Sequence, residues 1–424
     1  MSYARELTWS VKVNDAASGM ISKIDSGMDK IVAKTKLADK KLEGFGKGMQ
    51  KFSGKMNKLG STMTKSFTAP IVGVGAASVK TVAEFDATMS KVKVLSGATG
   101  DEFDALRDKA RKLGKETPHS AAQAAEGMAI LAAAGLDTNQ ILGSTGHMLN
   151  LMSAGDVGSD LAAKVLTTSY AQFDLEGTAK DAERVADAFT VGAKSATTDV
   201  GELQEAFKMG GTALAGMNMD VEESMAMFDM MAKGSLVGSQ AGTTVTALSR
   251  DIKANSDKFK EYGINVYDST GKARKMGEVL GDLERKMRGM TDAQKDSIKK
   301  TLFSGQAIRG LDVFLGQGAD KYKEFEKTIR EANGTTKTDA EEMADNLKGA
   351  LDQLKSGFQD FFIEIGDILK DDVILIADAV KGMVGKFAEL DDGTKKHIVN
   401  TALKVAAIGP AFKIFSKITS PIGK

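Results

Sequence analysis

The feature that most constrains the fold of this 424-residue chain is a regular series of helix-start signals between residues 120 and 239. A Ser, Thr or Asp recurs there every 17 to 22 residues, and several are followed three residues later by Gln or Glu, the spacing of a capping box. The predicted N-caps are Ser120, Asp137, Ser159, Thr178, Asp199, Asp220 and Ser239. The predicted helix ends are Gly135, Gly155, Gly177, Gly216 and Gly234. This pattern predicts short helices of about 12–16 residues, joined by tight turns in a compact bundle.

The composition supports an all-α fold. The chain has only 4 Pro, a residue that breaks helix interiors, and 42% of its residues are hydrophobic, which is enough to build cores. It has no Cys, and this excludes disulfides and thiol chemistry. Its length exceeds that of a single core, so we expect more than one domain.

A heptad ladder runs from Ile24 to Met63, where apolar residues alternate steps of four and three and only Thr35 is polar. One helix cannot bury such a seam alone, so we expect it to bind a partner helix or another copy of the chain. Interior glycines weaken this helix, because each costs roughly 1 kcal/mol relative to Ala. They are Gly44, Gly46, Gly48, Gly54 and Gly60. The ladder is therefore expected to be ordered only in an assembly.

A second ladder begins at Met343, after a predicted capping box formed by Thr338 and Glu341. Its apolar positions step strictly by three and four from Leu351 to Ile368. Two interpretations stay open for this seam: self-association, and packing against the bundle of short helices.

Two short β elements complete the prediction. Alternating apolar residues indicate a strand from Leu7 to Val13, and Ile264 to Lys272 indicates a small β-hairpin near residues 264–275. The expected architecture is a compact helical bundle flanked by long coiled-coil-like helices. The predicted domains are 1–80 (strand and basic heptad helix), 81–256 (core bundle), 257–337 (hairpin and short helices) and 338–424 (long helices with an amphipathic end).

Charge is unevenly distributed, although the net charge is zero. Residues 1–80 contain 14 Lys and Arg against 6 Asp and Glu. A basic arm can bind nucleic acid or anionic lipid, but this one lacks clustered Arg and interleaved aromatic residues. We therefore favour a solvated coiled-coil face and expect no sequence-specific binding of nucleic acid.

The sequence contains no recognisable catalytic or metal-binding set. Its three histidines are too far apart for a local metal motif, and each is interpreted as a structural or surface residue. They are His119, His147 and His397. The stretch from Gly48 to Lys55 is not a phosphate loop, because five residues separate its glycines and Met56 stands where a hydroxyl must bind magnesium. We expect no catalytic residue, metal or cofactor.

Carboxylates are too numerous for a catalytic acid pair to be excluded by counting. The acids of the bundle fall at predicted helix starts, where a structural role is favoured over a glycosidase-type pair. They are Asp199, Glu202, Asp220 and Glu223.

A methionine cluster near residue 225 has two interpretations. Methionine fills cores and also forms adaptable partner-binding surfaces. The spacing of Met227, Met230 and Met231 favours the core. The cluster also includes Met217, Met219 and Met225.

Two blocks rich in small residues, Thr117–Gly135 and Val237–Leu248, predict places where helices approach closely. Together with Val82–Val94 and Val200–Gly216, and in the same order and spacing, they resemble the core domain of phage tail tape-measure proteins. The strong part of the resemblance covers about residues 80–260, and looser similarity continues to the end of the chain.

The resemblance implies a structural ruler and scaffold for tail-tube assembly, in the tail lumen and in the host cytoplasm during assembly, that leaves the tail at genome ejection. It also implies tail tube, baseplate and assembly-chaperone proteins as partners, with membrane contact only at ejection. Family members commonly enter apolar segments where this chain ends, at Ala406–Lys424, so we expect it to be the N-terminal portion of a longer protein.

Two alternatives come from other functional classes. A membrane-active effector would insert Ser66–Val79 and Ile398–Ile418, although no segment approaches 18 consecutive apolar residues. A peptidoglycan-cleaving tail enzyme would need an acid pair that no sequence motif indicates. Both are weaker than the structural interpretation.

Overall fold

The computed structural model describes residues 72–346 and, beyond them, residues 348–353, 355–357, 359–360, 363–364, 366–367, 370–371 and 374. The predicted N-terminal strand, the first heptad ladder and His397 lie outside the described residues. The chain divides into two compact units, Ala87–Gly357 and the combination of Met1–Asp86 with Phe358–Lys424. The domain boundaries expected at residues 256 and 337 stay predictions.

Fifteen α-helices have defined bounds, the described residues from 348 to 374 are also helical, and no strand is assigned in the described residues. The first eight are α3 (Val72–Ser96), α4 (Asp101–Glu116), α5 (Ala121–Ala133), α6 (Thr138–Ala154), α7 (Ser159–Phe173), α8 (Ala179–Ser195), α9 (Val200–Ala215) and α10 (Val221–Lys233). The others are α11 (Gly238–Ala254), α12 (Ser256–Glu261), α13 (Met276–Met287), α14 (Asp292–Leu302), α15 (Gly305–Gln317), α16 (Ala319–Arg330) and α17 (Thr335–Ala344). Within this part of the chain, no helix has the length and apolar character needed to cross a membrane.

Five of the predicted helix starts are confirmed. At Ser120 the hydroxyl accepts from the Gln123 amide at 3.2 Å, and the Gln123 side chain accepts from the Ser120 amide at 2.8 Å, which completes a capping box. Complete boxes also begin α6, α8 and α10 at Asp137, Thr178 and Asp220. At α9 the Asp199 side chain accepts from the Glu202 amide.

Two other predicted starts in the bundle are wrong by one or two residues. Ser159 is the first residue of α7, after the N-cap Gly158, and Ser239 is the second residue of α11, after the N-cap Val237. Neither N-cap makes a side-chain hydrogen bond. Backbone geometry therefore sets these two starts, and a search for capping side chains cannot locate them.

Four of the five predicted glycines lie at helix ends, and these are Gly135, Gly155, Gly216 and Gly234. Gly135 itself has a positive φ of 91° after α5. After α6 and α10 the left-handed residue is instead the next one, Asp156 (φ 49°) or Ser235 (φ 60°). Gly177 was misplaced, because α7 has already ended at Phe173 with Asp174 left-handed at φ 52°. Short polar residues thus share with glycine the conformation that reverses the chain.

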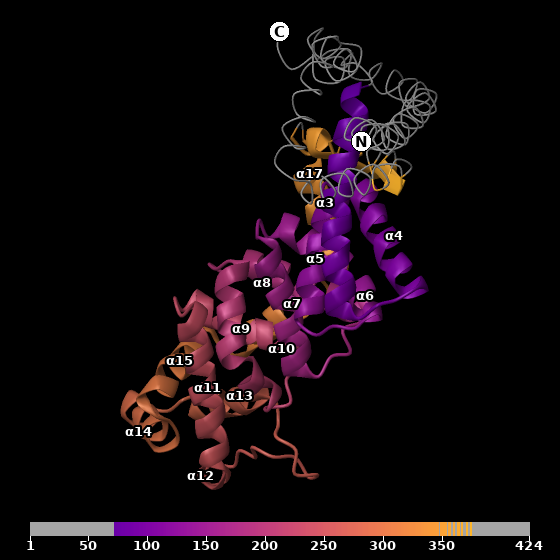
Figure 1. The fold of residues 1–424 in the computed structure, drawn as a ribbon. Helices are drawn as coiled ribbons and strands as arrows, with labels where there is room; N and C mark the ends of the chain where they lie inside the picture. Colours follow the sequence, from indigo (N-terminus) through magenta and orange to yellow (C-terminus); the bar gives the residue numbers. More distant parts are fainter. Residues whose placement is uncertain are drawn as a thin grey trace, which may run out of the picture. The chain divides into compact units, whose positions relative to one another are not determined.

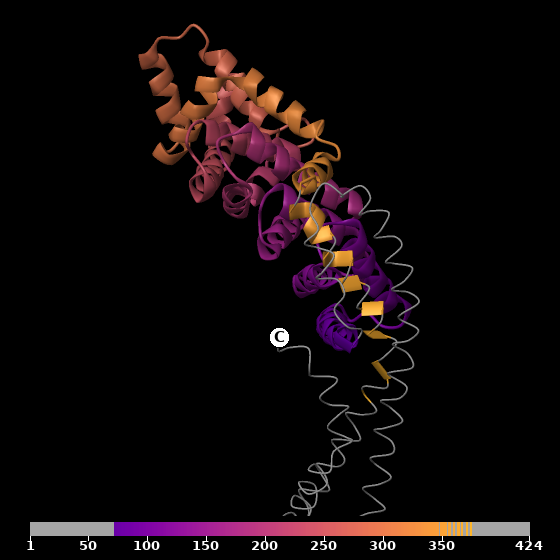
Figure 2. The same cartoon turned by 90° about the horizontal axis from the view of Figure 1, so that it is seen from above.

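The centre of the unit Ala87–Gly357 is α10, in which every residue from Val221 to Ala232 is buried. Helices α8, α9, α11, α15 and α16 pack against it, so helices from late in the sequence lie beside earlier ones (Figures 1 and 2). Aromatic rings fill the junction of three of these helices. The Phe207 ring of α9 lies 4.7 Å from that of Phe189 on α8 and 4.9 Å from that of Phe228 on α10, measured between centroids.

The end of this unit is tied back to its earlier helices. The Asp187 carboxylate on α8 accepts from the Gly334 and Thr336 amides at 2.7 and 2.8 Å, at the start of α17. Further on, the Ser356 hydroxyl donates to the Pro118 carbonyl at 3.3 Å. Helix α17 itself packs on α6 and α8. The chain therefore returns, after more than two hundred residues, to the helices near the beginning of the unit.

Helices α9 and α11 form the most extensive helix pair of the described structure, and this confirms the close approach predicted for the Val237–Leu248 block. At the crossing, a Cβ placed on Gly242 would lie 2.5 Å from Met209 Cβ and 2.6 Å from the Ala206 carbonyl oxygen. Hydroxyls also bridge the two backbones, since Thr246 donates to the Met209 carbonyl at 2.9 Å. Only glycine permits this separation.

The Thr117–Gly135 block behaves in the same way. A Cβ on Gly127 of α5 would lie 2.2 Å from Met148 Cε of α6. A Cβ on Gly114, at the end of α4, would lie 2.5 Å from the Ala121 amide nitrogen of α5. Small residues in both blocks therefore mark close helix contacts.

The predicted β-hairpin near residues 264–275 is not formed as two strands. The segment contains one isolated antiparallel bridge, between Tyr267 and Ala273. Its turn is closed by the Asp268 side chain, which accepts from the Thr270 and Lys272 amides at 2.8 and 3.0 Å. Two backbone hydrogen bonds also cross the segment, from the Asp268 amide to the Lys272 carbonyl at 2.9 Å and from the Arg274 amide to the Val266 carbonyl at 2.8 Å. The pairing is therefore hairpin-like but too short to form two strands.

The helix that precedes the second ladder starts earlier than predicted. Helix α17 begins after Gly334, which is left-handed with φ 74°, and Thr338 lies inside it. The Thr338 hydroxyl donates to the Gly334 carbonyl at 3.1 Å. The capping box predicted for Thr338 and Glu341 is therefore wrong, because a glycine with positive φ supplies the start.

Two described residues of the second ladder are exposed, Met343 at 51% and Leu351 at 40%. The buried described residues of the same stretch are Gly349, Ser356, Asp360, Ile363 and Gly366. None of these buried residues belongs to the apolar ladder, so the face that is buried here is a different one. Self-association through the seam stays a prediction.

The α9–α11 crossing gives a test by overpacking. Gly242→Ala should destabilise the protein by about 1–3 kcal/mol, because the new methyl group meets backbone that cannot move aside. Urea unfolding followed by circular dichroism measures the change. The matched control is Gly316→Ala in α15, where nothing lies within 4 Å of the new Cβ, and stability should rise by up to about 1 kcal/mol. Equal effects at the two sites would contradict the close-packing account.

Candidate functional site

The strongest concentration of ionisable groups lies at the first turn of α10. Arg330 of α16 donates to the Asp220 carboxylate at 2.7 Å and lies 3.2 Å from a Glu223 oxygen. Arg184 of α8 forms a two-pronged pair with Glu222, with one bond at 2.6 Å, and Lys275 donates to Glu223. The cluster joins α8, α10, α16 and the residue that precedes α13.

Burial and pairing set the electrostatics of this cluster. The side chains of Glu222 and Glu223 are only 6% and 3% exposed. Burial alone would raise the pKa of Asp220, but the Glu223 amide and the Arg330 guanidinium outweigh it and lower that pKa. A hydrogen bond to Glu223 raises the pKa of Lys275. The Asp220 carboxyl therefore contributes its full stability above its unfolded pKa of about 3.9, and this contribution is lost as the pH falls below that value through the lowered folded pKa.

This arrangement is structural in its chemistry. A catalytic acid pair needs a carboxyl that can release or take up a proton beside an open substrate site. Here the carboxylates accept from Arg, Lys and backbone N–H groups, and Asp220 and Glu223 also form the capping box of α10. The prediction that these acids occupy helix starts is confirmed. The salt bridges were not foreseen, because Arg184 and Arg330 lie 38 and 110 residues from their partners.

Both described histidines are half-buried within the bundle. His119 Nε2 lies 3.1 Å from the Leu149 carbonyl oxygen and 2.9 Å from the Ser153 hydroxyl. Burial lowers the pKa of His119 and of His147. His119, which lies just before the start of α5, thus connects that segment to α6 and has a structural role. No group of three or more His, Asp or Glu residues in the described part of the chain is arranged to hold a metal ion.

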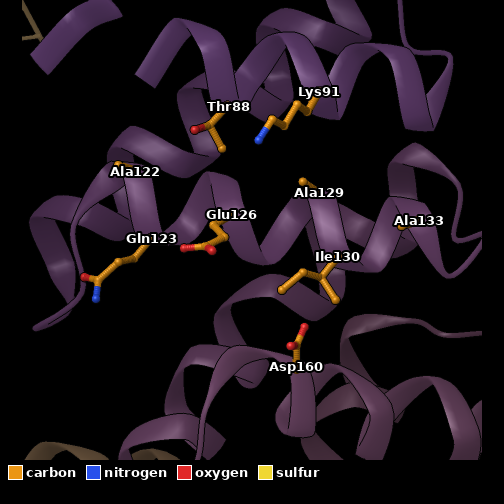
Figure 3. A pocket seen from close by; sticks show the side chains of 9 residues that line it. All are labelled: Thr88, Lys91, Ala122, Gln123, Glu126, Ala129, Ile130, Ala133 and Asp160. Carbon is orange, nitrogen blue, oxygen red and sulfur yellow. The ribbon is translucent and has the colours of Figure 1, made fainter. Parts of the chain in front are cut away.

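A groove of about 560 Å³ lies between α3, α5 and α7 (Figure 3). Its floor is α5, which lines it with three alanines and three larger residues, namely Ala122, Ala129, Ala133, Gln123, Glu126 and Ile130. Lys91 and Asp160 line it from α3 and α7 (Figure 3). These groups are exposed and belong to different helices, so the groove has the walls of a contact surface and lacks a nucleophile held by a base.

The methionine cluster belongs to the core, as its spacing indicates. All six members are 0–4% exposed, namely Met217, Met219, Met225, Met227, Met230 and Met231. The partner-binding interpretation is therefore wrong for this cluster, since no side chain in it reaches the surface. Met209 of α9 is the exposed methionine of this region, at 45%.

Removal of the central cation tests the charged cluster. Arg330→Met should destabilise the protein by about 2 kcal/mol, since it removes the nearest cation of Asp220 and leaves the buried Glu223 with Lys275 as its one remaining cation. The loss should stay below the ~3–5 kcal/mol of fully buried pairs, because the Arg330 side chain is 38% exposed. The control on the same helix is Lys327→Met, which breaks a pair that is 74% and 67% exposed and should cost about 0–1 kcal/mol. Thermal or urea unfolding of both variants measures the difference, and similar losses would argue against a structural cluster.

Comparison with known proteins points to one group. A family model described as "Phage-related minor tail protein" matches residues 107–304, from α4 to the N-cap of α15. The tape measure protein of Pneumococcus phage Dp-1 is 32% identical over 372 residues, which are 86% of this chain and 32% of that protein. A probable tape measure protein of Escherichia phage P2 is 25% identical over 305 residues, covering 68% of this chain and 37% of the relative.

A third relative, a probable tape measure protein of Clostridium phage phiCD119, is 22% identical over 381 residues, covering 84% of this chain and 38% of its own length. No solved structure shows a significant match. The chain spans about a third of the length of these relatives. The four sequence blocks, the helical unit that they build and these relatives agree: the chain belongs to the family of phage tail tape-measure proteins.

Proposed function

We propose that this chain works, as or within a tail tape measure, as a ruler and scaffold around which the phage tail tube assembles, and that it leaves the tail at genome ejection. The observation that carries the proposal is the match to the tape measure protein of Pneumococcus phage Dp-1 over 86% of the chain. An extended helix suits this role physically, because each residue adds a fixed rise of about 1.5 Å. The proposed place of action is the tail lumen, after assembly in the host cytoplasm.

The proposed role is structural and needs no catalysis. The acids of the cluster at α10 are engaged with Arg184, Arg330 and Lys275, and His119 is held by α6. Tail tube, baseplate and assembly-chaperone proteins are the proposed partners. Specific binding of nucleic acid is not part of the proposal.

We further propose that copies of the chain associate through the heptad seams, from Ile24 to Met63 and from Leu351 to Ile368. The support in the described residues is the exposure of two large apolar side chains, Met343 at the end of α17 and Leu351 in the helical segment that follows. Exposed apolar residues in a regular seam are stabilised by a partner helix. Such association would hold the tape as a bundle of helices.

Tail length tests the ruler directly. In a phage that carries the complete gene, deletion of 21 residues between Ile24 and Met63 keeps the heptad register and should shorten tails by ~30 Å at 1.5 Å per residue. Electron microscopy of purified particles measures the tails. Duplication of the same 21 residues is the matched control and should lengthen tails equally. Tails of unchanged length in both phages would refute the ruler for this segment.

The second seam is tested by a charge placed on it. Leu351→Glu should raise the dissociation constant for self-association at least tenfold, because a carboxylate would be buried at the seam. Gln353→Glu adds the same charge at an exposed position off the seam and should leave association unchanged. Analytical ultracentrifugation over a concentration series measures both. A wild-type chain that stays monomeric at high concentration would contradict the proposal.

A further inference from the structure

The central helix α10 carries a carboxyl that has no partner. Asp229 is completely buried, and neither of its side-chain oxygens forms a hydrogen bond in the described structure. It faces α8 at Gly192, where an added Cβ would lie 3.3 Å from Asp229 Oδ1 and 2.5 Å from Met225 Sδ. The Ser224 hydroxyl on the same helix is also buried without a partner. The carboxyl is therefore enclosed by tightly packed helices.

Charged groups on the neighbouring elements are committed elsewhere. On α8, Arg184 binds Glu222, Asp187 binds the start of α17 and Lys194 binds Asp339. On α11, Asp251 accepts from the Ser304 amide. On α15, Asp312 binds Lys299 and Arg309 is exposed. On α16, Arg330 and Glu326 bind each other, and Tyr322 donates to the Glu223 carbonyl.

Helix α9 presents no charged residue on its buried face. Within the described residues, Lys233, which lies one turn further along α10, is the charged group that lowers the pKa of Asp229. A single lysine near the surface end of the helix does not compensate a carboxylate in the core. The site favours a neutral carboxyl.

We propose that Asp229 is a pH-sensitive weak point of the helical unit: its carboxyl is protonated in the folded state, and its ionisation loosens the packing of α10 against α8. The unit is therefore more stable in mild acid than at neutral pH. Burial raises the pKa of Asp229 well above its usual range, and Lys233 offsets this only in part. Because the pKa of Asp229 is higher in the folded state than in the unfolded state, the free energy of unfolding falls as the pH rises.

The stability that the protonated Asp229 carboxyl contributes decreases as the pH rises. Above the unfolded pKa of about 3.9, the unfolded chain releases a proton that the folded chain retains. The unfolding equilibrium constant then rises up to tenfold per pH unit until the folded pKa is reached. His119 and His147 act with the opposite sign below about pH 6.5, because burial lowers their pKa. They are common to wild type and variants, so a comparison between the proteins cancels them.

The test compares the full chain with Asp229→Asn, which keeps the shape and removes the titration. Urea unfolding is measured by circular dichroism at pH 5, 6, 7 and 8. From pH 5 to pH 7, the unfolding constant of the wild type should rise at least tenfold more than that of Asp229→Asn. Glu261→Gln, which neutralises an exposed carboxyl on α12, should keep the wild-type profile.

Parallel pH profiles for wild type and Asp229→Asn would overturn the proposal. If the Asn variant does not fold, Asp229→Leu provides the same comparison without a group that needs hydrogen bonds. Hydrogen exchange of α10 amides at pH 5 and pH 7 locates the effect. Faster exchange at pH 7 after correction for the intrinsic rate, confined to other helices, would also count against Asp229.

Discussion

The complete burial of α10 is the constraint on which the rest of the helical unit depends. The backbone groups inside a buried helix pair within the helix, so its polar side chains must find their partners on neighbouring helices. Its acidic first turn is accordingly matched by Arg184 of α8, Lys275 and Arg330 of α16, and its Phe228 ring packs against that of Phe207 on α9. The exceptions on this helix are Asp229 and Ser224, whose buried side chains have no hydrogen-bond partner, and Asp229 is the one that can carry a charge.

Helix pairs around this centre use two different devices. Small residues let α9 and α11 approach until their backbones almost touch, and hydroxyls then bond across the gap. By contrast, α16 is held against α10 by salt bridges between long charged side chains. The residues matched by the tail-protein family include the small-residue pair, but they end before α16, which supplies Arg330. The structural unit is therefore larger than the matched segment.

The sequence predicts local features of this fold well and long-range ones poorly. Capping boxes such as Ser120 with Gln123 depend on residues three apart, so their spacing is visible in the chain. Starts set by backbone conformation, as at Val237 or Gly334, carry no such signal. The cation partners of Glu222 and Glu223 come from distant helices, and only the tertiary structure brings them together. The apolar alternation after Ile264 leads only to one isolated bridge, between Tyr267 and Ala273, beside a turn closed by Asp268.

The hydrogen bond between Ser356 and Pro118 bears on how much length each residue adds to the protein. Residues 87–357 would extend about 400 Å as one continuous helix. In the folded unit, the last residues lie against helices near its start, so these residues add little to the end-to-end length of the protein. If this protein measures length, the residues that set that length must lie outside residues 87–357. The folded unit would then add a fixed and small distance.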